Sequence, residues 1–262
     1  IAASHDIGCK AVKFQLFKIE DLFAPEILSK SKKHRDRIAW ELPVSFLPHL
    51  MEFSHNLKLQ FSCTPFYLKA VEELEPFVDF FKISSYEMIW DDLIVQCAKT
   101  GKDTVISTGM ATMNEIRNAV EKFRENSNAE LTLLHTISGY PTPANEANLM
   151  AIDTLRKSFE CNVGLSDHSV SPGVIYRAIH RWRASMVEFH LDLDTAGVEY
   201  ESGHCWLPSE IKPIIDDIKL GFRADGTGEK IPMPVEENER LWRADPSDGL
   251  RPLKILRASF DE

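Results

Sequence analysis

Short apolar runs alternate with helical segments along most of this chain, and this alternation constrains the fold more than any other feature. Seven runs have the length and composition of strands buried on both faces: residues 11–17, 59–66, 80–85, 103–110, 131–135, 162–169 and 186–192. Each strand-plus-helix unit takes roughly 20 to 30 residues. Residues 1–9 look like the end of a helix that leads into the first run, so we expect one further strand upstream of Ile1. Eight such units predict an α/β fold, the (β/α)8 TIM barrel.

A doubly wound open sheet is the alternative architecture. It is disfavoured because no glycine-rich turn follows any of the seven runs. The 262 residues, 44% of them hydrophobic, suit one large domain. We expect residues 1–222 to form the barrel. Residues 223–262 are rich in proline, glycine and charge, and we expect them to form a C-terminal extension that packs on the barrel.

Composition excludes several classes of function. The net charge of −10 argues against nucleic acid or an anionic membrane surface as a partner. No apolar run approaches the roughly 20 residues that span a bilayer, and no signal peptide is recognisable. The five cysteines are scattered without a CxxC pair, which indicates reduced thiols. We therefore expect a cytoplasmic protein.

The segment between residues 162 and 192 is the most informative unit. His168 lies near the end of its first run, while Glu188 and His190 lie within the second. Residues 172–184 between them have apolar side chains at helical spacing and predict one helix. Strand, helix and strand make a βαβ unit whose neighbouring strand ends lie roughly 5 Å apart. Two imidazoles with carboxylates nearby outline a divalent metal site, although each histidine could instead be a hydrogen-bonded core residue.

Nearly all of the remaining strands also end in polar side chains, and in a barrel the ends of the strands meet at one mouth. Lys13 and Lys82 lie within buried strands, where an unmet charge is costly, so they favour a bound anion. Hydroxyls that could complete a phosphate or carboxylate cradle belong to Thr64, Ser85, Ser107, Ser138 and Ser166. Alternatively, the hydroxyls only form hydrogen bonds with backbone groups at the ends of the strands, and the lysines pair with acidic residues. A Schiff-base aldolase is a third interpretation, against which the histidines argue.

Taken together, these residues closely resemble the sialic-acid synthase (N-acetylneuraminate synthase, NeuB) family. The matching segments are Lys13–Gln15, Cys63–Phe66, Lys82–Ser85 with Glu87, Ser107–Ala111, Ser138–Pro141, Gly164–Ser169 and Glu188–His190. They occur in order between about residue 8 and residue 210. The segment Trp242–Pro246 is similar to the branch that contains the spore-coat polysaccharide synthases.

The resemblance implies a transferase that condenses phosphoenolpyruvate with an N-acyl hexosamine such as N-acetylmannosamine. The products would be a nine-carbon sialic-acid-type sugar, for surface polysaccharide, and phosphate. His168 and His190 would hold a divalent ion, typically manganese, with magnesium as the other candidate. The residues implied to bind phosphoenolpyruvate are Lys13, Thr64, Lys82, Ser85, Ser107, Ser138 and Ser166, and those implied to face the sugar are Gln15, Glu87, Tyr140 and Glu199. Glu188, Lys82 and His190 would be catalytic, and the resemblance also implies a homodimer.

The chain departs from the family pattern at several points. Phe189 stands where the family usually has lysine, and Gly197-Val198-Glu199-Tyr200 replaces Gly-Pro-Asp-His, with His204 further on. The first-strand segment with a catalytic glutamate and the small C-terminal antifreeze-like domain are not in this sequence. Two other functions remain open: a phosphoenolpyruvate-dependent synthase acting on an aldose phosphate, and a non-catalytic barrel that serves as a binding or scaffold subunit.

Overall fold

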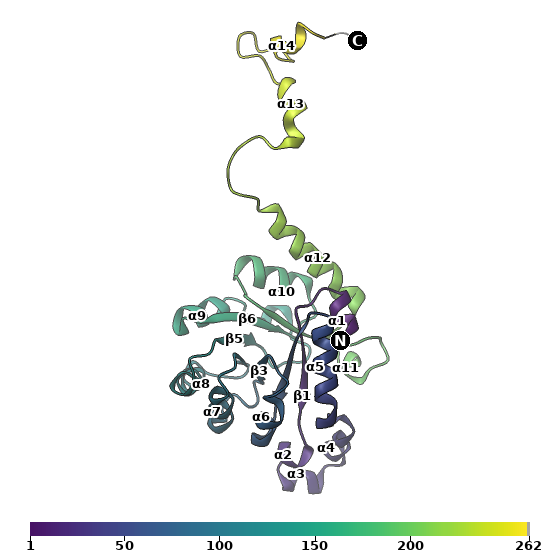
Figure 1. Ribbon diagram of the computed structural model, residues 1–262, viewed down its shortest axis with the longest axis vertical. Helices are drawn as coiled ribbons and strands as arrows, with labels where there is room; N and C mark the ends of the chain where they lie inside the picture. Colours follow the sequence, from purple (N-terminus) through teal and green to yellow (C-terminus); the bar gives the residue numbers. More distant parts are fainter. Residues whose placement is uncertain (261–262) are drawn as a thin grey trace. The chain divides into compact units, whose positions relative to one another are not determined.

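The computed structural model describes residues 1–260, and the chain divides into two units, Ile1–Ile218 and Lys219–Glu262. The first unit contains an eight-stranded parallel sheet whose strands pair in chain order. Its strands are β1 (Ala11–Leu16), β2 (Gln60–Pro65), β3 (Phe80–Ile83), β4 (Thr104–Ser107), β5 (Leu131–Thr136), β6 (Asn162–Asp167), β7 (Val187–Leu191) and β8 (Cys205–Trp206). The sheet curls into a half-barrel with helices on its outer face (Figure 1), so the predicted barrel class is confirmed.

Most strands are followed by a helix. The helices of the first unit are α1 (Ala2–Asp6), α2 (Ile19–Leu22), α3 (Pro25–Lys30), α4 (Lys32–Arg35), α5 (Leu47–Asn56), α6 (Leu68–Leu74), α7 (Asp91–Lys99), α8 (Met113–Asn126), α9 (Ala151–Phe159), α10 (Pro172–Tyr176), α11 (Val198–Glu201) and most of α12 (Pro208–Ala224). The second unit contains α13 (Glu237–Leu241) and α14 (Lys254–Arg257). The packing of residues 223–262 on the barrel stays a prediction.

Period-two alternation sorts each strand into an apolar and a polar face. Phe81 and Ile83 of β3 belong to the main hydrophobic core, whereas Lys82 between them points to the concave side. In β7, Val187 and Phe189 pack against hydrophobic clusters, and Glu188 and His190 face inward. The polar residues that the sequence places at strand ends therefore share the inner surface of the curved sheet.

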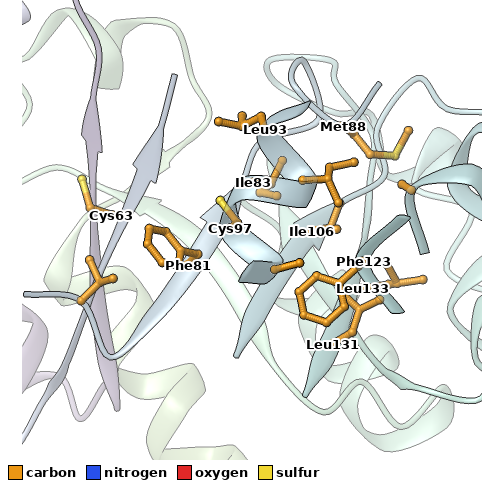
Figure 2. Packing of buried hydrophobic residues seen from close by; sticks show 14 of the residues in the cluster. Cys63, Phe81, Ile83, Met88, Leu93, Cys97, Ile106, Phe123, Leu131 and Leu133 are labelled. Atoms are coloured by element: carbon orange, nitrogen blue, oxygen red, sulfur yellow. The ribbon is translucent and has the colours of Figure 1, made fainter. Parts of the chain in front are cut away.

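The main core lies between the outer face of the sheet and the surrounding helices. Leu93 and Cys97 come from α7 and Phe123 from α8, and they pack with Phe81 and Ile106 of the strands (Figure 2). All five side chains are fully buried. Burying a large apolar side chain is worth about 1.5–3 kcal/mol, so this layer fixes the strands that present the polar residues.

The structure corrects the predicted secondary structure at two places. An eighth strand, β8, lies within the sequence and is not among the seven predicted runs; it is anchored by Trp206 in a second hydrophobic cluster with Ile211 and Ile214. The single helix expected over residues 172–184 instead ends as α10 at Tyr176 and continues as a π-helical turn, Arg177–Arg181.

The strand expected before Ile1 lies outside the sequence. Within residues 1–260, no helix is both long enough and apolar enough to cross a membrane. A cytoplasmic location and a homodimer stay predictions.

Candidate active site

Two lysines and one glutamate form the charged centre of the inner surface. Lys13 Nζ on β1 lies 3.9 Å from Glu188 Oε2, and Lys82 Nζ on β3 lies 3.7 Å from Glu188 Oε1. The side chain of Lys82 is 3% exposed and that of Glu188 is 19% exposed. The lysines therefore share a single carboxylate, which leaves one positive charge in excess at the centre of the site.

Burial and charge act in opposite directions on these groups. Burial lowers the pKa of Lys82 to about 8, although the nearby Glu188 carboxylate opposes the shift. Burial also acts to raise the pKa of Glu188, but Lys13 and Lys82 outweigh it and hold this pKa at about 2. At neutral pH, Glu188 is therefore ionised and Lys82 is largely protonated.

Hydroxyl groups surround the two lysines. Lys82 Nζ donates to Ser107 Oγ at 2.7 Å, and Ser166 Oγ donates to Glu188 Oε1 at 3.0 Å. Thr64 Oγ1 and Ser138 Oγ are buried and have no hydrogen-bond partner among the described residues. An unsatisfied buried hydroxyl costs about 1–3 kcal/mol, so both groups are suited to a polar ligand.

Gly109 brings two of the predicted hydroxyls close to the backbone. Its N–H donates to Ser85 Oγ at 3.0 Å. A Cβ at this position would lie 2.3 Å from Ser138 Oγ and 2.8 Å from Ser85 Oγ, so a side chain here would collide with both. The glycine that follows β4 therefore allows two serines from different loops to approach a single point.

The two predicted metal ligands lie side by side. The ring centroids of His168 and His190 are 5.3 Å apart. The Nδ1 atom of His168 lies 2.9 Å from the carbonyl oxygen of Ile137 and donates to it, which leaves Nε2 with a lone pair. Burial lowers the pKa of His168, and burial together with Lys13 lowers that of His190 to about 3. Both rings are neutral at pH 7, the form that binds metals.

A third histidine, which we did not select from the sequence, completes this cluster. The ring centroid of His204 lies 4.8 Å from that of His190 and 6.4 Å from that of His168. His204 Nε2 also lies 3.2 Å from Glu199 Oε2. The only sequence signal was a histidine between a charged loop and an apolar pair, which is too weak to identify a ligand.

The residues predicted to face the sugar lie at several places. Gln15 is paired in register with Thr64 across β1 and β2. The Tyr140 ring packs on that of His168 with centroids 4.3 Å apart, and Glu199 lies beside His204. Glu87 accepts a hydrogen bond from Ser84, and burial raises the pKa of Glu87. The structure thus brings Tyr140 and Glu199 to the histidines, whereas Glu87 lies on the loop after β3.

Comparison with known proteins fits this geometry. The profile of the NeuB family matches residues 1–230. The chain belongs to the NeuB family. It is 30% identical over 252 residues to the N,N'-diacetyllegionaminic acid synthase of Campylobacter jejuni, covering 90% of this chain and 75% of that protein.

Solved structures of related proteins have the same fold. The N-acetylneuraminic acid synthetase of Leptospira borgpetersenii superposes with a TM-score of 0.77 at 27% identity, over 90% of this chain and 81% of that one. The spore coat polysaccharide biosynthesis protein spsE of Bacillus subtilis gives a TM-score of 0.73 at 23% identity, over 92% and 71% of the two chains. The family resemblance found in the sequence is therefore confirmed.

Proposed function

We propose that this NeuB family member condenses phosphoenolpyruvate with an N-acyl hexosamine, forming a nine-carbon sialic-acid-type sugar and releasing phosphate. The observation that carries the proposal is a pair of lysines, Lys82 buried and Lys13 22% exposed, that share one carboxylate. Two ammonium groups facing a single Glu188 attract an anion more strongly than a closed ion pair does. The names of the two synthases described above support an acidic sugar as the product.

Phosphoenolpyruvate fits the hydroxyl cradle. Lys13 and Lys82 bind its anionic oxygens, and the partnerless hydroxyls of Thr64 and Ser138 donate to them. Ser85, Ser107 and Ser166 complete the predicted set. Most of these groups lie on strands or in the loops directly after them. They are therefore oriented before the substrate binds, and little reorganisation is needed during the reaction.

The histidine cluster fits a divalent ion. His168 and His190 are neutral and adjacent, and His168 Nε2 keeps its lone pair because Nδ1 carries the proton that is donated to the Ile137 carbonyl. A divalent ion at these residues would polarise the aldehyde of the open-chain sugar. Tyr140 and Glu199 lie beside the same rings and would orient that sugar.

The proposed reaction forms one C–C bond and breaks the C–O bond to phosphate. Carbon 3 of phosphoenolpyruvate forms a C–C bond to the aldehyde carbon, whose oxygen takes up a proton and becomes a hydroxyl. Water adds to carbon 2 and loses one proton, the C–O bond to phosphate breaks, and the remaining hydroxyl on carbon 2 loses its proton and becomes the keto group. Of these two protons, one balances the proton taken up by the aldehyde oxygen and the other leaves with the phosphate. Glu188, ionised between the lysines, stabilises positive charge that develops at carbon 2. Lys82 stabilises or protonates the departing phosphate, and its pKa of about 8 suits a proton donor near neutral pH.

A phosphate-release assay on the full chain tests this proposal. Phosphoenolpyruvate is supplied with each of a panel of N-acyl hexosamines, with and without 6-phosphate, and with Mn²⁺, Mg²⁺ or Co²⁺. We expect release that depends on both a sugar and a metal ion, and a product whose mass equals that of the two substrates plus water minus phosphate. Lys82→Met should abolish release, whereas Glu121→Gln on the exposed surface of α8 should not alter it. Sugar-independent release, or none with any sugar, contradicts the proposal.

A further inference from the structure

The loop between β7 and β8 returns to the histidine pair and adds further groups that bind metals. The side-chain ligand atoms of His190, Glu199, His204 and Cys205 all lie within 4.8 Å of one another. His204 and Cys205 are buried, and Cys205 is paired in register with His190. A set of two imidazoles and a carboxylate is typical of sites for divalent transition metals.

Ring spacing permits the three histidines to share one ion. With metal–nitrogen bonds of about 2.1 Å, each ring centre lies roughly 3.2 Å from the ion, so two bound rings have centres at most about 6.4 Å apart, when they lie on opposite sides of the ion. The three observed separations are 4.8, 5.3 and 6.4 Å. The pairs that include His190 lie within this limit, and the His168–His204 pair reaches it, so those two rings would bind from opposite sides of the ion.

The hydrogen bonds around His204 are compatible with a cation at its Nε2 atom. The hydroxyl of Ser202 donates to the Glu199 carbonyl oxygen at 2.6 Å, so it can only accept from His204 Nδ1, which lies 2.6 Å away. In the neutral ring this leaves a lone pair on Nε2, which faces the Glu199 carboxylate at 3.2 Å. Two acceptors this close need a cation between them, either a second ring proton or a metal ion.

We propose that His204 and Glu199 bind the same divalent ion as His168 and His190, and that this nitrogen-rich set shifts the metal preference from Mn²⁺ towards Zn²⁺ and Co²⁺. Imidazole suits Zn²⁺ and Co²⁺, whereas Mn²⁺ binds preferentially to oxygen ligands. The inference deepens the proposed function, and it gives the departure of Glu199 and His204 from the family pattern a chemical role.

Metal titration of the full chain without either substrate tests the inference. Affinities for Mn²⁺, Co²⁺ and Zn²⁺ are measured by calorimetry after chelator treatment, and the visible spectrum of the Co²⁺ form reports its coordination. We expect His204→Ala to weaken Zn²⁺ binding 10- to 100-fold, to weaken Mn²⁺ binding less, and to weaken the Co²⁺ absorption bands. His204→Asp restores a ligand atom, so Mn²⁺ binding should recover while the ratio of Zn²⁺ to Mn²⁺ affinity stays low. Glu199→Gln should weaken the binding of all three ions.

The control variant is His55→Ala, which removes an exposed histidine paired with Asp79 and should leave all three affinities unchanged. Circular dichroism verifies that each variant is folded. If folded His204→Ala binds Zn²⁺ within twofold of the parent chain, with an unchanged Co²⁺ spectrum, the inference is wrong. Because no substrate is present, this result is independent of the proposed function: phosphate release could fail while the metal set holds, or the reverse.

Discussion

Replacing Glu188 with glutamine should destabilise the fold while strengthening anion binding. Glutamine keeps the size of the side chain and an oxygen that can accept from Ser166, but it removes the charge shared by Lys13 and Lys82. At separations of 3.9 and 3.7 Å and an effective dielectric constant of about 20, each pair is worth roughly 4 kcal/mol before desolvation is subtracted. Removing one partner of a buried ion pair costs about 3–5 kcal/mol, and the partial exposure of Glu188 favours the lower figure, about 3 kcal/mol.

Urea unfolding at pH 7 measures the loss of stability, and calorimetry measures phosphoenolpyruvate binding. The excess charge of the centre rises from one to two, so we expect phosphoenolpyruvate to bind roughly tenfold more tightly, equivalent to about 1.4 kcal/mol. Phosphate release should fall at the same time, because the carboxylate that we propose to stabilise charge at carbon 2 is lost. A stability change under about 1 kcal/mol with unchanged binding would show that Glu188 does not hold the lysines, and the electrostatic reasoning would be refuted.

Three further perturbations test other parts of the site. Gly109→Ala places a methyl group against two serine hydroxyl oxygens at 2.3 and 2.8 Å, so the KM for phosphoenolpyruvate should rise at least tenfold, whereas Gly173→Ala, whose nearest neighbour is 4.0 Å away, should leave it unchanged. The charged form of Lys82 is present below its pKa of about 8, so kcat/KM should fall as pH rises through 8, and Lys82→Arg should remove this limb of the profile. The Asp167 carboxylate accepts hydrogen bonds from the Trp206 indole at 3.0 Å and from the backbone N–H of Ser169, next to His168. Asp167→Ala should therefore lower the free energy of unfolding by about 2–4 kcal/mol and weaken metal binding roughly tenfold.

The longer strands and their polar residues could be predicted from the sequence because each of these strands combines apolar residues for the core with polar residues for the inner surface. In β3, two large apolar residues flank Lys82, and only a strand places the three on alternate faces. The same pattern places Glu188 and His190 on one face of β7. Their meeting at one surface then follows from the parallel order of the strands.

The missed features depend on contacts that no local pattern contains. β8 is only two residues long, and Trp206 belongs to it because of tertiary packing rather than periodicity. His204 comes just before this strand, so it could not be assigned to the site without it. The π-helical turn after α10 retains apolar residues at spacings close to those of an α-helix, so it is indistinguishable from one in the sequence.

The brevity of β8 has a consequence for the edge of the sheet. Its ladder to β7 joins only two residue pairs, His190 with Cys205 and Leu191 with Trp206. An ion held by His190 and His204 would cross-link these two segments beside this short ladder. Metal loading should therefore slow amide hydrogen exchange at Cys205 and Trp206 far more than at β3 or β4, and chelation should open this edge first.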